Sequence, residues 1–139
     1  MERSQPQTPD LADVACRHAI QLILQFGSTV DGPVHSRRSD MDLAILLKDA
    51  EVSLERLGAI QDDLRASFPG RDVDLAMINR ADPLFLKQIT ERCRLLHGPV
   101  QTFQRLRLYA FKRYQDHRRF LDLERRFVNQ TLDRLAAGQ

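Results

Sequence analysis

Residues 40–47 read Asp-Met-Asp-Leu-Ala-Ile-Leu-Leu, in which two acids lead into a continuous apolar run. Residues 72–78 (DVDLAMI) repeat this pattern, because Asp74 precedes Leu-Ala-Met as Asp42 precedes Leu-Ala-Ile. Short apolar runs bounded by polar residues are typical of strands buried in a sheet. We therefore predict two strands, each of which exposes aspartate near its start.

Another strand precedes this pair. Residues 19–26 (AIQLILQF) are apolar, and residues 27–39 after them are polar and contain Gly32-Pro33, which indicates a loop. Two strands joined by such a loop most simply pair antiparallel. Caps and periodicity predict a helix that starts at Thr8-Pro9-Asp10, a second over 54–68, and a third from Asp82-Pro83 to about Cys93. A short edge strand at 94–97 and a last helical segment follow.

The order of these elements predicts an α+β fold, in which a small mixed sheet packs against flanking helices. A chain of 139 residues fits one domain, so we expect a single domain over 1–139 with its core at about 8–100. The segment from about 103 to 136 lacks glycine and proline and should form one long helix, or two with a bend. One mostly apolar helical stripe contains Phe103, Leu106, Ala110, Tyr114, His117, Leu121, Val128, Leu132 and Leu135.

The composition is that of an ordinary globular chain, with 42% hydrophobic and 29% charged residues. Its apolar runs fall short of the roughly 20 residues that a transmembrane helix needs, and residues 1–10 lack the basic and apolar regions of a signal peptide. Cys16 and Cys93 are isolated thiols, which suits a reducing compartment. We therefore expect a cytoplasmic protein with no membrane partner.

The net charge of +2 is unevenly distributed along the chain. From residue 103 onward nine arginines and lysines accompany four acids, so this segment carries about +5 and the remainder about −3. Such charge could face nucleic acid or an acidic protein partner, and a solvated helix face is its default explanation. We assign the aromatic residues of this segment to core and interface, and therefore predict no direct binding to nucleic acid.

The three acids at the strand starts form a candidate site. Asp40 and Asp42 are two residues apart, so their side chains leave one face of a strand with Cα atoms about 6.6 Å apart. Asp74 joins them if its strand lies alongside. Carboxylates about 5 Å apart repel by roughly 3 kcal/mol at an effective dielectric near 20, so the group requires a cation or protonation. Oxygen ligands favour Mg²⁺, with Mn²⁺ as the alternative.

Gly27 and Ser28 stand where residues 19–26 end. Glycine lets the backbone approach a phosphate closely, and serine adds a hydroxyl and an amide donor. Arg37 and Arg38 in the same loop would supply positive charge to a phosphate, or remain solvated loop charges. Phosphate donors beside a divalent-metal cluster describe a nucleoside triphosphate site.

These motifs together resemble the polymerase β-type nucleotidyltransferases, and in particular the minimal nucleotidyltransferases (MNT) that act as antitoxins to HEPN toxins. The resemblance covers about residues 10–125. It rests on Gly27-Ser28, on Ser39-Asp40-Met41-Asp42-Leu43, on Val73-Asp74-Leu75, and on the segments 82–98 and 109–118. It implies the small mixed sheet of that family, with flanking helices and a long C-terminal helix.

The resemblance also implies a mechanism, which is Mg²⁺-dependent protein adenylylation. Asp40 and Asp42 would hold two metal ions, and Asp74 would bind the ion on the acceptor side and help deprotonate the acceptor hydroxyl. Gly27 and Ser28 would hold the β and γ phosphates of ATP. The acceptor would be a tyrosine of a cognate HEPN ribonuclease toxin, which AMP would silence, and the two proteins would form a hetero-oligomer.

Two departures from the family keep other functions open. Eleven residues separate Ser28 from Asp40 where the family usually has ten, and Thr29 stands where many members have arginine. The same chemistry could act on a small molecule or an RNA end, although 139 residues leave little mass to enclose a drug. A third hypothesis is a non-catalytic antitoxin that docks its long C-terminal helix against the toxin.

Overall fold

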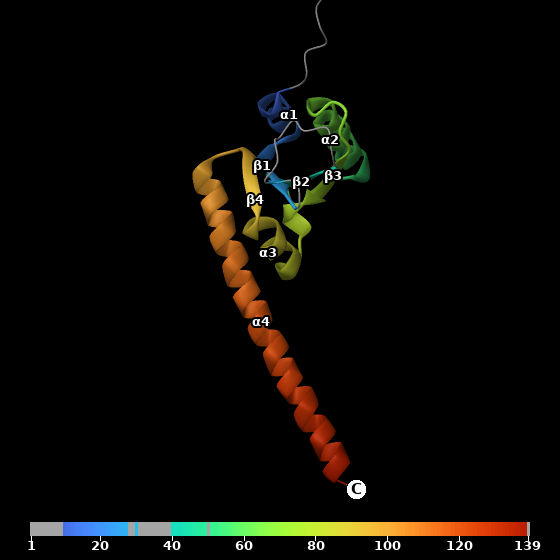
Figure 1. Cartoon of the computed structure of the whole chain (residues 1–139), viewed down its shortest axis with the longest axis vertical. Helices are drawn as coiled ribbons and strands as arrows, with labels where there is room; N and C mark the ends of the chain where they lie inside the picture. The colour runs from blue at the N-terminus through green and yellow to red at the C-terminus, as the bar shows by residue number, and fades with distance from the viewer. Residues whose placement is uncertain (1–9, 28–29, 31–39, 50, 139) are drawn as a thin grey trace, which may run out of the picture.

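The computed structural model describes residues 10–27, 30, 40–49 and 51–138 as a four-stranded sheet with helices on both faces (Figure 1). The sheet has the order β3-β2-β1-β4. β1 pairs antiparallel with β2 and with β4, and β2 pairs parallel with β3. The predicted α+β class, the mixed sheet and the antiparallel pair are confirmed. The strands are β1 (Ile20–Phe26), β2 (Met41–Leu47), β3 (Val73–Met77) and β4 (Cys93–His97).

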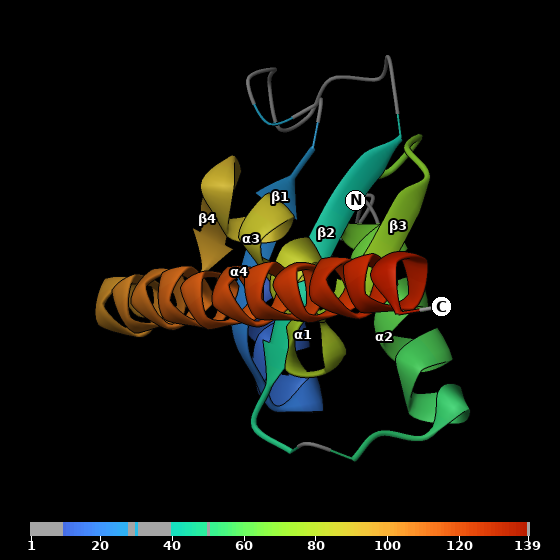
Figure 2. The same cartoon turned by 90° about the horizontal axis from the view of Figure 1, so that it is seen from below.

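The helices form two layers, one on each face of the sheet. They are α1 (Leu11–His18), α2 (Leu54–Ser67), the 3₁₀ turn η1 (Ile78–Arg80), α3 (Pro83–Glu91) and α4 (Val100–Ala137). Helices α1 and α2 cover one face, and α3 and α4 cover the other (Figures 1 and 2). Side chains alternate along a strand, so Leu43 and Ile45 of β2 pack under α1 and α2 whereas Ala44 packs under α3 and α4.

The helix starts follow capping chemistry, with one correction. Ser53 and Asp82 cap α2 and α3 as predicted, and accept hydrogen bonds from the amides of Arg56 (3.2 Å) and Phe85 (2.7 Å). The predicted start of the first helix at Thr8-Pro9 is wrong, because α1 begins at Leu11 and Asp10 is its N-cap. Thr8 and Pro9 lie outside the described residues. Threonine and aspartate both cap well, so the sequence offers two candidates two residues apart.

The connection from α3 to α4 differs slightly from its prediction. The helix α3 ends at Glu91 rather than near Cys93, and Cys93 already belongs to β4. Gly98 then turns the chain with a φ of +120°, and Pro99 is the N-cap of α4. The last helix therefore begins at Val100, three residues before its predicted start.

Helix α4 is one continuous helix of 38 residues, about 57 Å long at 1.5 Å per residue. Leu106 and Ala110 are buried against the sheet and α3, and the Lys87 ammonium lies 4.4 Å from the centre of the Tyr114 ring. All residues from 118 to 138 are exposed, and this half of α4 extends away from the sheet (Figure 1). None of the described helices combines the length and the apolar character that a membrane span requires.

Candidate active site

The start of β2 and the start of β3 bring the three predicted aspartates together. Asp42 and Asp74 are direct partners in the parallel ladder, and the Met41 amide donates to the Asp72 carbonyl (2.8 Å). Partners in a ladder point to the same face of the sheet, which here is the face that α3 and α4 cover. Asp40 lies one residue before β2 and two residues from Asp42, so it shares that face.

Asp42 is the electrostatic centre of this group. Its side chain is half-buried, whereas Asp40 and Asp74 are exposed. Burial raises the pKa of the Asp42 carboxyl above its usual value, and the negative charges of Asp74 and Asp40 raise this pKa further. The negative charge of Asp42 is therefore unfavourable in the folded protein, and a cation among the three carboxylates would remove this unfavourable energy.

One member of an aromatic pair lies on the strand next to Asp42. Phe26 is its partner across the β1–β2 ladder and belongs to the same face of the sheet. The Phe26 ring meets the Phe85 ring of α3 edge to face, with centroids 6.0 Å apart and an interplanar angle of 80°. The cap at Asp82 fixes the first turn of α3, from which Phe85 reaches Phe26.

Gly27 touches the same carboxylate. Its φ is +85°, and a Cβ atom built on it would lie 2.7 Å from Oδ2 of Asp42. Only glycine leaves room for that oxygen while the chain turns out of β1. The structure thus places Gly27 beside Asp42, and its role at a phosphate stays a prediction. The other predicted phosphate-binding residues, Ser28, Arg37 and Arg38, lie outside the described residues.

The donor set of this group suits a hard divalent cation. Within the described residues, no three acid, histidine or cysteine side chains are already gathered closely enough to hold a metal ion. Asp40, Asp42 and Asp74 are nevertheless close enough for two of them to shift the pKa of the third. Carboxylate oxygens that repel one another are the ligands that Mg²⁺ and Mn²⁺ accept. Metal binding by these residues stays a prediction.

Sequence reasoning missed two residues that anchor the chain after Gly27. Arg94 of β4 donates from its guanidinium to the carbonyl of Val30, and the Val30 amide donates to the Gly27 carbonyl (3.3 Å). Val30 is buried although it stands in a polar stretch. The available signals were a charge inside the apolar edge strand CRLLH and an apolar residue inside the loop. Arg94 is therefore a positioning residue for the turn beside Asp42.

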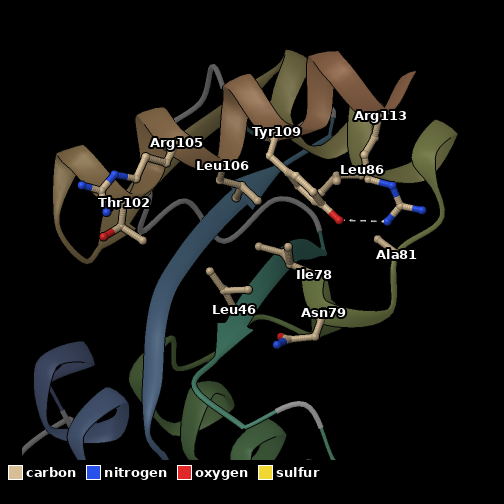
Figure 3. A pocket seen from close by; sticks show the side chains of 10 residues that line it. All are labelled: Leu46, Ile78, Asn79, Ala81, Leu86, Thr102, Arg105, Leu106, Tyr109 and Arg113. Carbon is tan, nitrogen blue, oxygen red and sulfur yellow. Dashed lines mark hydrogen bonds between the residues drawn. The ribbon is translucent and has the colours of Figure 1, made fainter. Parts of the chain in front are cut away.

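A cavity of about 400 Å³ lies between α4 and the far ends of β2 and β3 (Figure 3). One of its walls is Leu46, four residues along β2 from Asp42 and hence about 13 Å from it. The cavity is therefore separate from the carboxylates, although it opens on the same face of the sheet. It is lined by Leu46, Ile78, Asn79, Ala81, Leu86, Thr102, Arg105, Leu106, Tyr109 and Arg113.

Replacement of Gly27 by alanine should impair the site more than the fold. The new Cβ must displace the Asp42 carboxylate, and a misplacement of about 1 Å at a reacting group can cost roughly 100-fold in rate. Gly70→Ala is the matched control, because Gly70 has a similar φ of +80° but nothing within 4 Å of its Cβ position. Both variants should lose about 1–2 kcal/mol of stability from backbone strain. Only Gly27→Ala should lose about 100-fold in nucleotidyl transfer. Equal rates in both variants would contradict this interpretation of the contact.

Comparisons with known proteins agree with this geometry. Residues 10–99 match the family model described as "Polymerase beta, Nucleotidyltransferase". A search of curated proteins finds no match.

The overall fold is shared with solved toxin–antitoxin structures. A crystal structure of a toxin–antitoxin with AMP-PNP contains a chain that is 23% identical, with a TM-score of 0.65, over 88% of this chain and 94% of that one. A chain in the complex of the tri-AMPylated Shewanella oneidensis HEPN toxin with MNT antitoxin is 22% identical, with a TM-score of 0.62. This match covers 88% of this chain and 92% of that one. A chain in the crystal structure of the MntA–HepT toxin–antitoxin is 21% identical with a TM-score of 0.61, and the match covers 88% of this chain and 92% of that one. At this level of identity the likeness establishes the fold.

Proposed function

The chain belongs to the polymerase β nucleotidyltransferase family, and from that premise we propose that it is a Mg²⁺-dependent protein adenylyltransferase whose acceptor is a cognate HEPN-type toxin. AMP would pass from ATP to a tyrosine of the toxin and neutralise it. The observation that carries this proposal is the direct pairing of Asp42 with Asp74, with Asp40 beside them and Gly27 in contact with Asp42. The fold shared with the AMP-PNP and tri-AMPylated toxin complexes supports the donor and the acceptor class.

In the proposed reaction the tyrosine oxygen attacks the α-phosphorus of ATP. A bond forms between these two atoms, the bond from the α-phosphorus to the oxygen that bridges the α and β phosphates breaks, and pyrophosphate leaves. Asp74 would accept the hydroxyl proton of the incoming tyrosine, a role that its exposed side chain supports. The Gly27 turn, with Ser28 after it, holds the β and γ phosphates through backbone and hydroxyl donors.

Asp40, Asp42 and Asp74 would hold the divalent ions. Two ions in such a site supply charge neutralisation at the attacking and the leaving oxygen. The protein's own contribution is to fix the carboxylates: β2 and β3 set the spacing of Asp42 and Asp74, and the Gly27 turn limits where Asp42 can move. Arg94 keeps the turn in place through Val30.

Incubation of the protein with α-labelled ATP, Mg²⁺ and the protein encoded by the adjacent gene tests the proposal. Wild type should transfer label to the partner, and Asp40→Asn/Asp42→Asn should not. Asp10→Asn/Asp13→Asn is the matched control, since it removes two carboxylates from the opposite layer of helices. Replacement of each tyrosine of the partner by phenylalanine should locate the acceptor.

The same experiment separates the other functions. If the double aspartate variant neutralises the partner as well as wild type does, binding alone accounts for the antitoxin effect. If the partner stays unlabelled while an aminoglycoside or an RNA 3′ end acquires the label, the acceptor is not the toxin. If wild type labels none of these, the adenylyltransferase proposal is wrong.

A further inference from the structure

The outer half of α4 carries an apolar stripe with no covering layer among the described residues. We define this distal stripe as Phe120, Leu121, Phe127, Val128, Leu132 and Leu135, whose exposed fractions range from 46% to 70%. Helical spacing places these side chains on one side of α4, which also carries Glu124 and Thr131 between them. They continue the line of Leu106 and Ala110, which pack against α3 and the sheet. The stripe is thus an extension of an interface that the first half of α4 already makes.

This half of α4 lacks support from the rest of the described chain. The Lys87–Tyr114 contact joins α4 to α3, and every described residue of α4 beyond His117 is exposed. Isolated helices of about 12–15 residues are marginal in water, and helices in proteins depend on packing of their apolar face. The outer half of α4 has about twenty residues and exposes several phenylalanine and leucine side chains, so we expect another surface to pack against it.

The stripe leads into the cavity at the root of α4. Tyr109, Phe120 and Phe127 are separated by eleven and seven residues, which places them along one line of the helix. Tyr109 lines the cavity, where the Arg113 guanidinium donates to its hydroxyl (3.2 Å, Figure 3). A helix that packs along the stripe toward the domain therefore ends at this cavity, which is lined by apolar side chains and by Arg105 and Arg113. Among the described residues, no carboxylate lines this cavity.

One edge of the stripe is positively charged. Arg107, Arg118 and Arg125 are also separated by eleven and seven residues, and so they lie along the side of α4 next to Leu121 and Leu132. In the described part of the chain, none of the ion pairs involves these three arginines. A surface that complements this edge carries carboxylates.

A second copy of the chain fits this surface poorly. An antiparallel two-fold pair brings the same edge of each helix together, so the edge with Arg118 and Arg125 would face the equally charged edge of the other copy. A parallel pair would place each domain where the other one lies, because the domain sits on the stripe side of α4's first half (Figure 1). Both geometry and charge therefore favour a different chain.

We infer that the distal stripe and the cavity form one docking surface for an amphipathic helix of the acceptor protein, a helix with acidic residues along the edge that meets Arg118 and Arg125. The inference rests on the proposed function, because it makes the docked protein the one that receives the nucleotide. The stripe belongs to the side of the sheet from which Asp42 and Asp74 emerge. A protein held there lies on the same side of the sheet as the carboxylates.

Binding of the full-length chain to the protein encoded by the adjacent gene, measured by calorimetry without ATP, tests the surface. Leu121→Asp/Val128→Asp should weaken binding by about 30-fold or more, the range of interface hot spots. Leu108→Asp/Leu123→Asp is the matched control, since it places the same charges on exposed apolar residues outside both the stripe and the arginine edge. It should bind like wild type. Circular dichroism checks that α4 stays helical in both variants.

The charged edge has its own matched pair of variants. Arg118→Glu/Arg125→Glu should weaken binding about tenfold and flatten its dependence on salt, because it removes the attraction to the partner's carboxylates. Arg119→Glu/Arg126→Glu makes the same change in charge on the opposite side of the helix and should leave the affinity unchanged. Equal losses in the two variants would mean that only overall charge matters, which would overturn the assignment of this edge.

The outcomes separate the docking surface from the chemistry. If the stripe variant binds the partner like wild type, the docking surface is wrong while transfer can still occur. If wild type binds through the stripe but transfers no label, the adenylyltransferase proposal fails and the docking surface stands. If wild type is a dimer in sedimentation analysis without the partner and the stripe variant is a monomer, a second copy covers the stripe and the inference is overturned.

Discussion

Asp42→Asn should raise the free energy of unfolding at pH 7 in the absence of divalent ions, while it lowers nucleotidyl transfer by about 1000-fold or more. Loss of a group that merely supports a metal ligand costs roughly 10- to 100-fold, so loss of the half-buried member of the proposed ligand set should cost more. The gain in stability arises because Asp42 is held ionised against burial and against the charges of Asp74 and Asp40. Stability and activity should therefore change in opposite directions.

The pH dependence of unfolding gives the sign of this effect. The pKa of Asp42 is raised in the folded state above its unfolded value, so between these two pKa values the folded state binds more protons. Wild-type stability therefore falls as the pH rises through the folded pKa, and the Asp42→Asn variant lacks this loss. The difference between the two proteins should be fully present at pH 7 and vanish as the pH approaches the unfolded pKa near 4.

Denaturant unfolding with EDTA at several pH values measures this difference. Added Mg²⁺ should raise the wild-type midpoint and have a much smaller effect on Asp42→Asn, because ligands that bind the folded state stabilise it. A variant that is less stable than wild type at pH 7 in EDTA would show that Asp42 is not under electrostatic strain.

Gly98→Ala should be the most destabilising small substitution in the connection to α4. The φ of +120° disfavours any side chain, at roughly 1–2 kcal/mol. A Cβ atom would also lie 2.4 Å from the Gln21 carbonyl oxygen and 2.6 Å from Cδ2 of Leu22, and such overpacking costs roughly 1–3 kcal/mol. The two costs add up to about 2–5 kcal/mol. Neither is easily relieved, because one neighbouring atom belongs to the backbone and the other to a buried side chain.

Thermal unfolding measures this loss as a decrease in Tm of roughly 8–20 °C. Gly58→Ala is the control, since Gly58 lies inside α2 and has nothing within 4 Å of its Cβ position. That variant should be more stable by roughly 0.5–1 kcal/mol, because glycine is a poor helix residue. If Gly98→Ala unfolds at the wild-type temperature, β4 and α4 can shift far enough from β1 to relieve the clash, and the steric argument is wrong.

Local patterns were sufficient to predict most of the elements. The apolar runs before Gly27 and after Asp40 and Asp74 each became a strand, and the caps at Ser53 and Asp82 start their helices. The period-two alternation of a strand also predicted that Asp40 and Asp42 share a face. These features depend on neighbours within a few residues, which the sequence displays directly.

Features set by long-range packing were not predictable in the same way. Whether Asp74 lies beside Asp42 depends on the register of β2 with β3, which the crossover through α2 fixes. The hydrogen bond of Arg94 to Val30 joins residues 64 positions apart. Periodicity also predicted that α4 has an apolar side. It did not predict that the described chain leaves the outer half of this side uncovered, because a stripe carries no information on what packs against it.

The position of β1 in the sheet has a consequence for how the chain folds as it is synthesised. β1 is the first strand in the sequence, yet it lies inside the sheet and pairs with β4, the last strand to emerge. Until residue 97 has left the ribosome, one edge of β1 has no ladder partner, and Leu22 and Leu24 lack part of their cover. Contacts of such long sequence separation slow folding and prolong the exposure of unpaired strands. A stall in translation between residues 47 and 93 should therefore leave a nascent chain that chaperones bind and that aggregates readily when released.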